Sequence, residues 1–271
     1  MSRAPSFGRA LAVRCAVWLA CFVTLYPIFW VLRLATGGTG SPLRNFAEVV
    51  GRTSTGGEWL FGRQLLNSVV VSSAAALAGI AVSVGAAYAF SRWEFPGRKA
   101  GLRALLVTQM FPSVVVAVPL YVLLEALGLL DSLAGLVLVY SSTTIPFSTW
   151  MLKGYFDTLP RELEEAALLD GATRLGVLRL VVLPLARPAI VVTALFSFMN
   201  GWNEFILAAT FLNRETLFTL PVALQSYVGD YSTQWGLFAA GAILVSIPVM
   251  ALFFLLQRHL VGGLTAGGVK G

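Results

Sequence analysis

The chain has 271 residues, of which 57% are hydrophobic and 12% are charged, and its formal net charge is +6. The charged fraction is about half that of an ordinary soluble domain, so there are too few polar side chains to give every helix a hydrated face. This composition argues against a soluble globular protein and predicts an all-α membrane protein.

Charged residues divide the sequence into six long apolar segments. These lie between the charged residues at 14 and 33, 63 and 92, 103 and 125, 131 and 153, 187 and 204, and 230 and 258. A helix needs roughly 20 apolar residues to cross the hydrocarbon core, and the fifth segment reaches that length by continuing past Glu204 to Leu212. We therefore expect six transmembrane helices. The first runs on through "FVTLYPIFWVL" without a small-x-small cleavage site, which favours a retained helix over a signal peptide.

The distribution of basic residues predicts the orientation. With a cytoplasmic N-terminus, 14 of the 19 lysines and arginines fall on the cytoplasmic side and 5 on the outer side. This asymmetry predicts a multi-pass protein of the cytoplasmic (inner) membrane with both termini in the cytoplasm. The basic residues are scattered over separate short loops, so we expect membrane lipid as a partner and no nucleic acid.

The longest cytoplasmic loop contains "ELEEAALLDGATRLGVLRLVVLP", residues 162–184. Three glutamates near its start favour a helix N-terminus, and Gly171 can adopt the left-handed conformation that ends a helix. A second helix is expected after the turn, with Pro184 bending it at the membrane. A thin, acidic helix of this kind is suited to a groove on another protein. The alternative is an amphipathic connector lying on the lipid headgroups.

This segment resembles the EAA loop of bacterial ABC importer permeases. The family pattern is Glu-Ala-Ala, three residues, Gly, nine residues, an aliphatic residue, one residue, then Leu-Pro. Val181 stands where isoleucine is usual. The matching positions here are Glu165, Ala166, Ala167, Gly171, Val181, Leu183 and Pro184.

The resemblance extends over most of the chain. "LLNSVVVS" (65–72), "AYAFSRWEFPGR" (87–98) and "WNEF" (202–205) are similar to family segments, and "FLLQRHLVGGLTAGGVKG" (254–271) is similar to the smaller permease of maltose-type importers. The first span and the loop 36–62 match least. The resemblance implies a type I ABC importer permease fold with a cytoplasmic coupling helix.

The same resemblance implies a division of the chain and a set of partners. Residues 1–62 would form an N-terminal cytoplasmic segment, the first helix and an outer loop. Residues 63–262 would form a five-helix core with the EAA loop at about 160–185, and residues 263–271 a cytoplasmic tail. The partners would be a second permease in a heterodimer, an ATPase dimer, an extracytoplasmic sugar-binding protein that the outer loop 213–234 reaches, and the sugar itself.

By this resemblance the loop couples ATP hydrolysis to transport. Glu165 would pair with a basic residue of the ATPase, the two alanines would allow close approach, and Gly171 would supply the turn. The residues expected to take part in coupling are Glu164, Glu165, Ala166, Ala167, Asp170, Gly171, Leu183 and Pro184.

No enzymatic site is expected in the chain itself. None of its three lysines lies in a P-loop motif, so ATP and Mg²⁺ are expected on the partner ATPase and no cofactor on this chain. Cys15 and Cys21 form no readable disulfide or metal site, and a single histidine cannot supply an intramembrane catalytic group. A secondary carrier is the other alternative, but it would need ionisable residues at mid-depth in several spans, and these spans are nearly free of them.

The fifth span carries polar residues that are candidates for lining a sugar pathway: Asn200, Trp202, Asn203 and Glu204. Amides and a carboxylate can bond sugar hydroxyls, and an indole can stack on a sugar ring. Helix–helix hydrogen bonding explains such residues equally well. Maltose or maltodextrin is the expected substrate, with trehalose or another oligosaccharide as the alternative.

Overall fold

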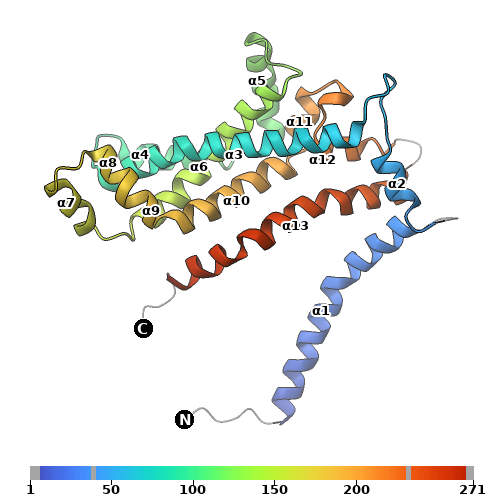
Figure 1. Cartoon of the computed structure of the whole chain (residues 1–271), viewed down its shortest axis with the longest axis horizontal. Coiled ribbons are helices and arrows are strands. Elements are labelled where there is room, and N and C mark those ends of the chain that lie inside the picture. Colours follow the sequence, from blue (N-terminus) through green and yellow to red (C-terminus); the bar gives the residue numbers. More distant parts are fainter. Residues whose placement is uncertain (1–6, 38–40, 230–232, 267–271) are drawn as a thin grey trace. The chain divides into compact units, whose positions relative to one another are not determined.

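The structure is a computed structural model that describes residues 7–37, 41–229 and 233–266 (Figure 1). Its described residues form helices, and the only β-contacts among them are two isolated bridges. The elements are α1 (Phe7–Thr36), α2 (Arg44–Val50), α3 (Leu60–Arg92), α4 (Arg98–Thr108), α5 (Ser113–Ala126), α6 (Leu133–Phe156), α7 (Glu162–Leu169), α8 (Arg174–Val177), a π-helical segment η1 (Leu178–Val182), α9 (Leu183–Leu185), α10 (Arg187–Asn203), α11 (Ile206–Phe211), a 3₁₀ turn η2 (Glu215–Leu217), α12 (Leu220–Gln225) and α13 (Trp235–Ala266).

The chain divides into two compact units. Unit 1 comprises residues 1–52 and 224–246, and unit 2 comprises residues 53–223 and 247–271. Within unit 1, Asn45 of α2 donates to the backbone oxygens of Ala35 and Gly37 at 2.8 and 3.2 Å. The Arg52 side chain donates to Ser226 Oγ at 2.6 Å. The short helix α2 is thus tied to the end of α1, while Arg52 ties the segment after α2 to the segment that precedes α13.

Three long helices form the core of unit 2. Helix α3 packs along α6 and α10, as Figure 1 shows. Small residues allow this close approach: Gly201 faces Ser72 and Tyr140, and Ser148 and Ser197 share a hydrogen bond of 3.0 Å. Side chains larger than these would separate the helices, so hydroxyl and glycine positions set the packing distance of the bundle.

The third apolar segment is not the single straight span that the sequence predicts. It is split into α4 and α5, which are bent by 102° at the break. Pro112 has no N–H to donate and disfavours helical backbone at the residue before it, and helix α5 begins directly after it. Helix α4 has no buried residue.

The fifth segment is also interrupted, where the sequence predicts an unbroken run to Leu212. Glu204 leaves the helical conformation with ψ 126° and ends α10. Its carboxylate accepts the backbone N–H groups of Leu207 and Ala208 at 2.9 and 3.1 Å. It thereby caps α11 with negative charge at the helix N-terminus.

Three described helices are long and apolar enough to cross a membrane: Val13–Thr36, Leu60–Arg92 and Trp235–Gln257. Counting each bent pair as one span raises the number to five. Helix α6 has 24 residues but carries a run of four hydroxyl side chains at 141–144. The six-span topology stays a prediction. Helix α13 continues to Ala266, past residue 263, at which the predicted tail begins. The rest of that tail, residues 267–271, lies outside the described residues.

Candidate functional site

The loop 160–185 folds as the sequence predicts, into a helix, a turn and a second helix. Helix α7 presents two distinct faces. Its outer face consists of the exposed residues Glu162, Glu165, Ala166 and Leu169, which follow the spacing of one helical stripe. Leu169 is 90% exposed, an unusual position for a leucine at the end of a charged helix. An apolar tip beside carboxylates is suited to a protein surface rather than to water.

The inner face of α7 consists of Glu164, Ala167 and Leu168. Ala167 and Leu168 pack against a buried apolar cluster built from the ends of α3 and α6 and from α8 and η1. Glu164 lies beside Arg92, the last residue of α3, and both side chains are less than a tenth exposed. Of the acidic residues expected to take part in coupling, Glu164 therefore points into its own chain, whereas Glu165 points outward.

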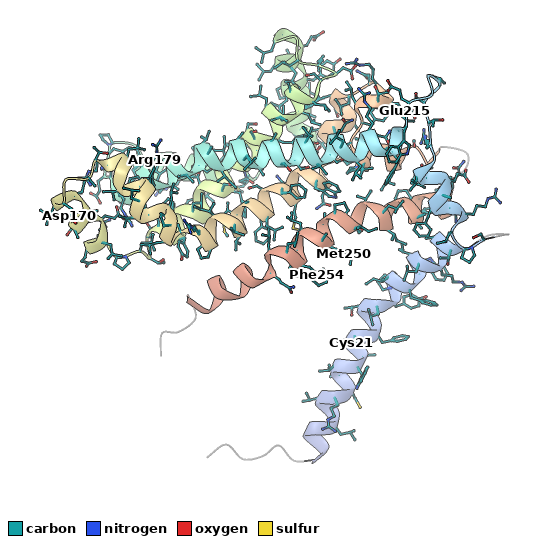
Figure 2. All side chains as sticks on the ribbon, in the orientation of Figure 1. Cys21, Asp170, Arg179, Glu215, Met250 and Phe254 are labelled. Atoms are coloured by element: carbon teal, nitrogen blue, oxygen red, sulfur yellow. The ribbon has the colours of Figure 1, made fainter. Side chains whose placement is uncertain are left out.

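Gly171 ends this helix in the left-handed conformation that the sequence predicts, with φ +89°. The backbone N–H of Gly171 donates to Leu168 O at 3.1 Å, and that of Ala172 donates to Ala167 O at 3.0 Å. These two bonds form a Schellman motif, which satisfies carbonyl groups at the helix end. Asp170 lies exposed at this turn, and Figure 2 places it at the end of unit 2 that is opposite Glu215.

The second helix of the loop begins at Thr173, whose hydroxyl accepts the N–H of Gly176 at 3.1 Å. It continues through the π-helical segment η1 and then turns by 79° into α10. The turn lies at Ala186, two residues after Pro184, the residue expected to bend the helix. Leu183 packs on the same apolar cluster as α7, and Pro184 is exposed.

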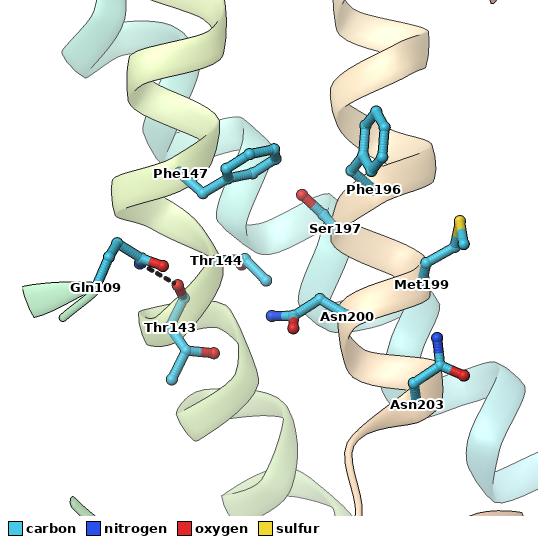
Figure 3. Close-up of a pocket in the computed structure, with 9 residues that line it drawn as sticks. All are labelled: Gln109, Thr143, Thr144, Phe147, Phe196, Ser197, Met199, Asn200 and Asn203. Carbon is cyan, nitrogen blue, oxygen red and sulfur yellow. Dashed lines mark hydrogen bonds between the residues drawn. The ribbon is translucent and has the colours of Figure 1, made fainter. Parts of the chain in front are cut away.

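A polar groove lies between α6 and α10 where α4 ends. Its volume is about 350 Å³, and an adjoining groove of about 410 Å³ shares Gln109, Thr143 and Asn200 with it. Figure 3 shows Asn200 and Asn203 on α10, with Gln109 on the opposite wall donating to Thr143 O at 3.0 Å. The rings of Phe147 and Phe196 close one end. The walls therefore offer amide donors and acceptors beside apolar ring faces.

The two other candidates of the fifth segment are placed differently. Trp202 is 1% exposed and its ring stacks on Phe198, with centroids 5.5 Å apart, so it fills the interior of unit 2. Glu204 lines the adjoining groove, but its carboxylate is already occupied by the cap of α11 and by the Tyr140 hydroxyl at 2.7 Å. Gln109 and Thr143 were not among the sequence candidates. The break before Pro112 is the one signal that could have indicated Gln109.

Within residues 7–37, 41–229 and 233–266, no group of three or more histidine, cysteine, aspartate or glutamate side chains could hold a metal ion. Cys15 and Cys21 are both free and exposed on α1.

Comparison with known proteins agrees with this architecture. Residues 79–265 match the family described as "Binding-protein-dependent transport system inner membrane component". The chain is 40% identical over 215 residues to maltodextrin transport system permease protein MdxG of Bacillus subtilis, covering 79% of this chain and 77% of that protein. It is 39% identical to sulfoquinovosyl glycerol transport system permease protein SmoH of Agrobacterium fabrum, covering 76% and 73%. It is 42% identical to maltose/maltodextrin transport system permease protein MalG of Escherichia coli, covering 76% and 72%.

Solved structures show the same fold. A bacterial ABC transporter involved in the import of alginate matches with a TM-score of 0.79 at 22% identity, covering 95% of this chain and 99% of that chain. The methionine ABC transporter MetNI matches with a TM-score of 0.62 at 18% identity, covering 76% and 97%. The predicted all-α membrane fold is confirmed. The chain belongs to the family of binding-protein-dependent transport system inner membrane components, the permease subunits of ABC importers.

Proposed function

We propose that this chain is one of two permease subunits of an ABC importer for maltose or maltodextrin, driven by a separate ATPase dimer. The outer face of α7 carries the proposal, because it combines carboxylates, a small alanine and the exposed Leu169 on one stripe of a helix. Such a stripe fits a groove on a partner whose rim is basic and whose floor is apolar. We assign that groove to the ATPase, and the second permease would complete the translocation pathway.

The relatives support a sugar as the substrate. Those named for maltose or maltodextrin are 40–43% identical, and one named for sulfoquinovosyl glycerol is 39% identical. Because relatives named for different sugars are almost equally identical to this chain, the identities favour a sugar as the substrate more strongly than they favour one particular sugar. Trehalose or another oligosaccharide is therefore the alternative. Purified complex with its binding protein would decide this, because the transported sugar is the one that stimulates ATP hydrolysis.

The remaining parts of the assembly follow from the same proposal. Both termini lie in the cytoplasm, on the side of α7. The segment 213–229, with η2 and α12, faces outward toward the sugar-binding protein. Gln64 and Asn67 of α3 hold the first half of this segment by donating to the backbone oxygens of Glu215, Thr216 and Phe218. A segment fixed in this way presents a defined surface to a docking protein.

The test of the coupling role is Glu165→Lys, which reverses a charge on the outer face of α7. A charged contact at a largely desolvated interface contributes about 2 kcal/mol or more when one partner is lost, so ATPase association should fall by at least tenfold. Co-purification and sugar-stimulated ATP hydrolysis measure this. Glu94→Lys is the matched control, since the Glu94 side chain is 94% exposed after α3. Normal transport by Glu165→Lys would contradict the coupling role and leave the loop as a surface connector between two membrane helices.

The polar groove is proposed to line the sugar path, with Asn200 and Asn203 as hydrogen-bonding groups. Asn200→Leu and Asn203→Leu should lower uptake at limiting sugar and leave assembly and basal ATP hydrolysis unchanged. Thr210→Leu is the control, because Thr210 is exposed on α11 and its hydroxyl bonds only Ile206 O of its own helix. Unchanged uptake in both asparagine variants would assign these amides to contacts between helices.

A further inference from the structure

The ion pair between Arg92 and Glu164 joins the end of a membrane helix to the start of the loop helix. Arg92 Nε donates to Glu164 Oε1 at 2.6 Å, and Nη2 lies 2.6 Å from the same oxygen. The Tyr88 hydroxyl donates to the other carboxylate oxygen at 3.0 Å. Both oxygens of Glu164 are therefore engaged by α3, and the two side chains are only 7% and 8% exposed.

The pair belongs to a wider polar cluster that also includes the end of α6. Arg92 Nη1 donates to Ser91 Oγ at 2.8 Å, and Ser91 Oγ donates to Asp157 Oδ1 at 2.6 Å. Lys153 holds the other oxygen of Asp157. The Arg92 guanidinium at the end of α3 is thus connected to two elements that follow much later in the sequence: the start of α7 directly through Glu164, and the end of α6 through Ser91 and Asp157.

This arrangement determines which face of α7 points outward. Glu164, Ala167 and Leu168 share the inner face, but Ala167 and Leu168 are only half-buried. Apolar contacts of that size tolerate rotation and sliding, whereas hydrogen bonds to both oxygens of one carboxylate do not. A buried ion pair is a poor source of net stability, since apolar residues of similar volume do as well. Its distinctive contribution is a fixed direction and register.

We propose that Arg92 is a positioning residue for coupling. Through Glu164 it fixes the rotation of α7, so that the outer face meets the partner and movement of α7 passes directly to α3. This proposal rests on the proposed function, in which the outer face docks on an ATPase. The positioning itself is a property of this chain, so it can be measured with or without that partner.

The first experiment reads the orientation of α7 in the assembled permease pair, without ATPase. Cys15 and Cys21 are replaced by serine, and a cysteine is placed at Leu168 on the inner face or at Ala166 on the outer face. A hydrophilic maleimide should label position 166 quickly and position 168 slowly. Arg92→Glu should raise the labelling rate at 168 by at least tenfold. The double variant Arg92→Glu/Glu164→Arg should return it to within about twofold of the starting rate.

The second experiment measures coupling in the complete complex, reconstituted in proteoliposomes. Coupling is the rise in ATP hydrolysis when maltotriose and the binding protein are added. Arg92→Glu and Glu164→Arg should each lower sugar-stimulated ATP hydrolysis at least tenfold relative to basal hydrolysis, and the swapped pair should recover. Glu58→Arg/Arg63→Glu is the matched control, because that pair lies at the other end of α3, its side chains are separated by 3.4 Å, and both are 50% exposed. It should change coupling by less than twofold.

Arg92→Lys is the variant to use if the reversed charges prevent assembly of the complex. It keeps the positive charge but cannot reproduce the planar, forked hydrogen-bonding geometry of the guanidinium. It should assemble and lose part of the coupling. An assembled Arg92→Lys or Arg92→Glu complex with slow labelling at position 168 and normal coupling would overturn the proposal. So would a swapped pair that assembles but recovers neither readout. A third outcome separates the two proposals: faster labelling at position 168 in the Arg92 variants, together with normal coupling in Glu165→Lys. That result would support the positioning role of Arg92 and reject the ATPase as the partner of α7.

Discussion

Two charge clusters lie at opposite ends of α6, and they are built differently. At the α7 end, the Arg92 and Glu164 side chains are buried and each depends on the other. At the other end, which we call the α11 end, Asp131 Oδ1 accepts the backbone N–H groups of Asn213 and Arg214 at 2.9 and 3.2 Å. Arg214 also pairs with Asp131, but its side chain is 66% exposed.

The two clusters differ in how they respond when one charged side chain is removed. At the α11 end, backbone N–H groups hold the carboxylate even without the guanidinium, and water can replace the exposed partner. At the α7 end, removal of one side chain leaves its partner charged and buried. The α7 end therefore depends on contacts between side chains, chiefly the one between Arg92 and Glu164, whereas the α11 end also has contacts to the backbone.

The largest expected effect is on the α7 end. Glu164→Ala should destabilise the packing of α7 by about 3–5 kcal/mol, because it strands the buried guanidinium of Arg92. Arg214→Ala should cost at most about 1 kcal/mol, as expected for an exposed ion pair. Hydrogen exchange of the α7 amides and of the amides at 213–214 measures both. Equal losses of stability in the two variants would contradict the conclusion that the two clusters are built differently.

A smaller effect is expected at the turn that ends α7. Gly171→Ala should cost about 1–2 kcal/mol because an alanine at φ +89° is strained, although a Cβ there meets no atom within 4 Å. The control is Gly154→Ala in α6, where the space is also open and φ is ordinary. That change should be neutral or slightly stabilising. Thermal unfolding of the purified complex compares them, and an equal effect of the two would remove strain as the cause.

The smallest effect is a response to acid, and it should appear at both ends. Burial raises the pKa of Asp157, but the hydrogen bonds from Lys153 and Ser91 together lower it by more than burial raises it. Its pKa therefore lies below the ordinary value. Burial also raises the pKa of Asp131, but the backbone N–H of Asn213, the Arg214 side chain and the backbone N–H of Arg214 together lower it by more, so that this pKa too lies below the ordinary value. Such carboxylates stabilise the fold above their unfolded pKa of about 3.9 and lose that contribution as the pH falls through the folded pKa.

Protection of backbone amides, corrected for intrinsic exchange, should accordingly hold from pH 7 to about 4 and decline below it. Asp131→Asn should remove the acid response at 213–214 and leave the response near Asp157 unchanged. If protection at 213–214 in that variant still declined over the same range, a group other than Asp131 would be titrating.

Local signals in the sequence were enough for the parts of the fold that are local in the chain. The conformation of Gly171 and the helix–turn–helix of the loop follow from residues within a few positions of each other. The apolar segments likewise marked where long helices lie. Pro112 is also a local signal, but the long run of uncharged residues around it predicts one continuous span.

Contacts between distant residues were not accessible in this way. Arg92 and Glu164 are paired by the packing of α3 beside α6, and no periodicity connects positions so far apart. Charge alone therefore groups Glu164 with its neighbour Glu165, although successive residues of a helix are rotated by about 100°, which places Glu164 on the inner face and Glu165 on the outer face. In the same way, the sequence predicts a continuous helix through Glu204, whereas α10 ends there and the Glu204 carboxylate accepts the backbone N–H groups of Leu207 and Ala208 at the start of α11.

The π-helical segment η1 has a genetic consequence. Its bonds span five residues instead of four, so the stretch 178–182 holds a surplus residue compared with an α-helix. Loss of any one codon in this stretch would let the backbone close as an ordinary α-helix. The segments on either side would keep their relative rotation, because the wider turn already absorbs the surplus residue. Deletion of one residue should therefore be tolerated better here than in α3 or α6, where it would rotate the rest of the helix by about 100°.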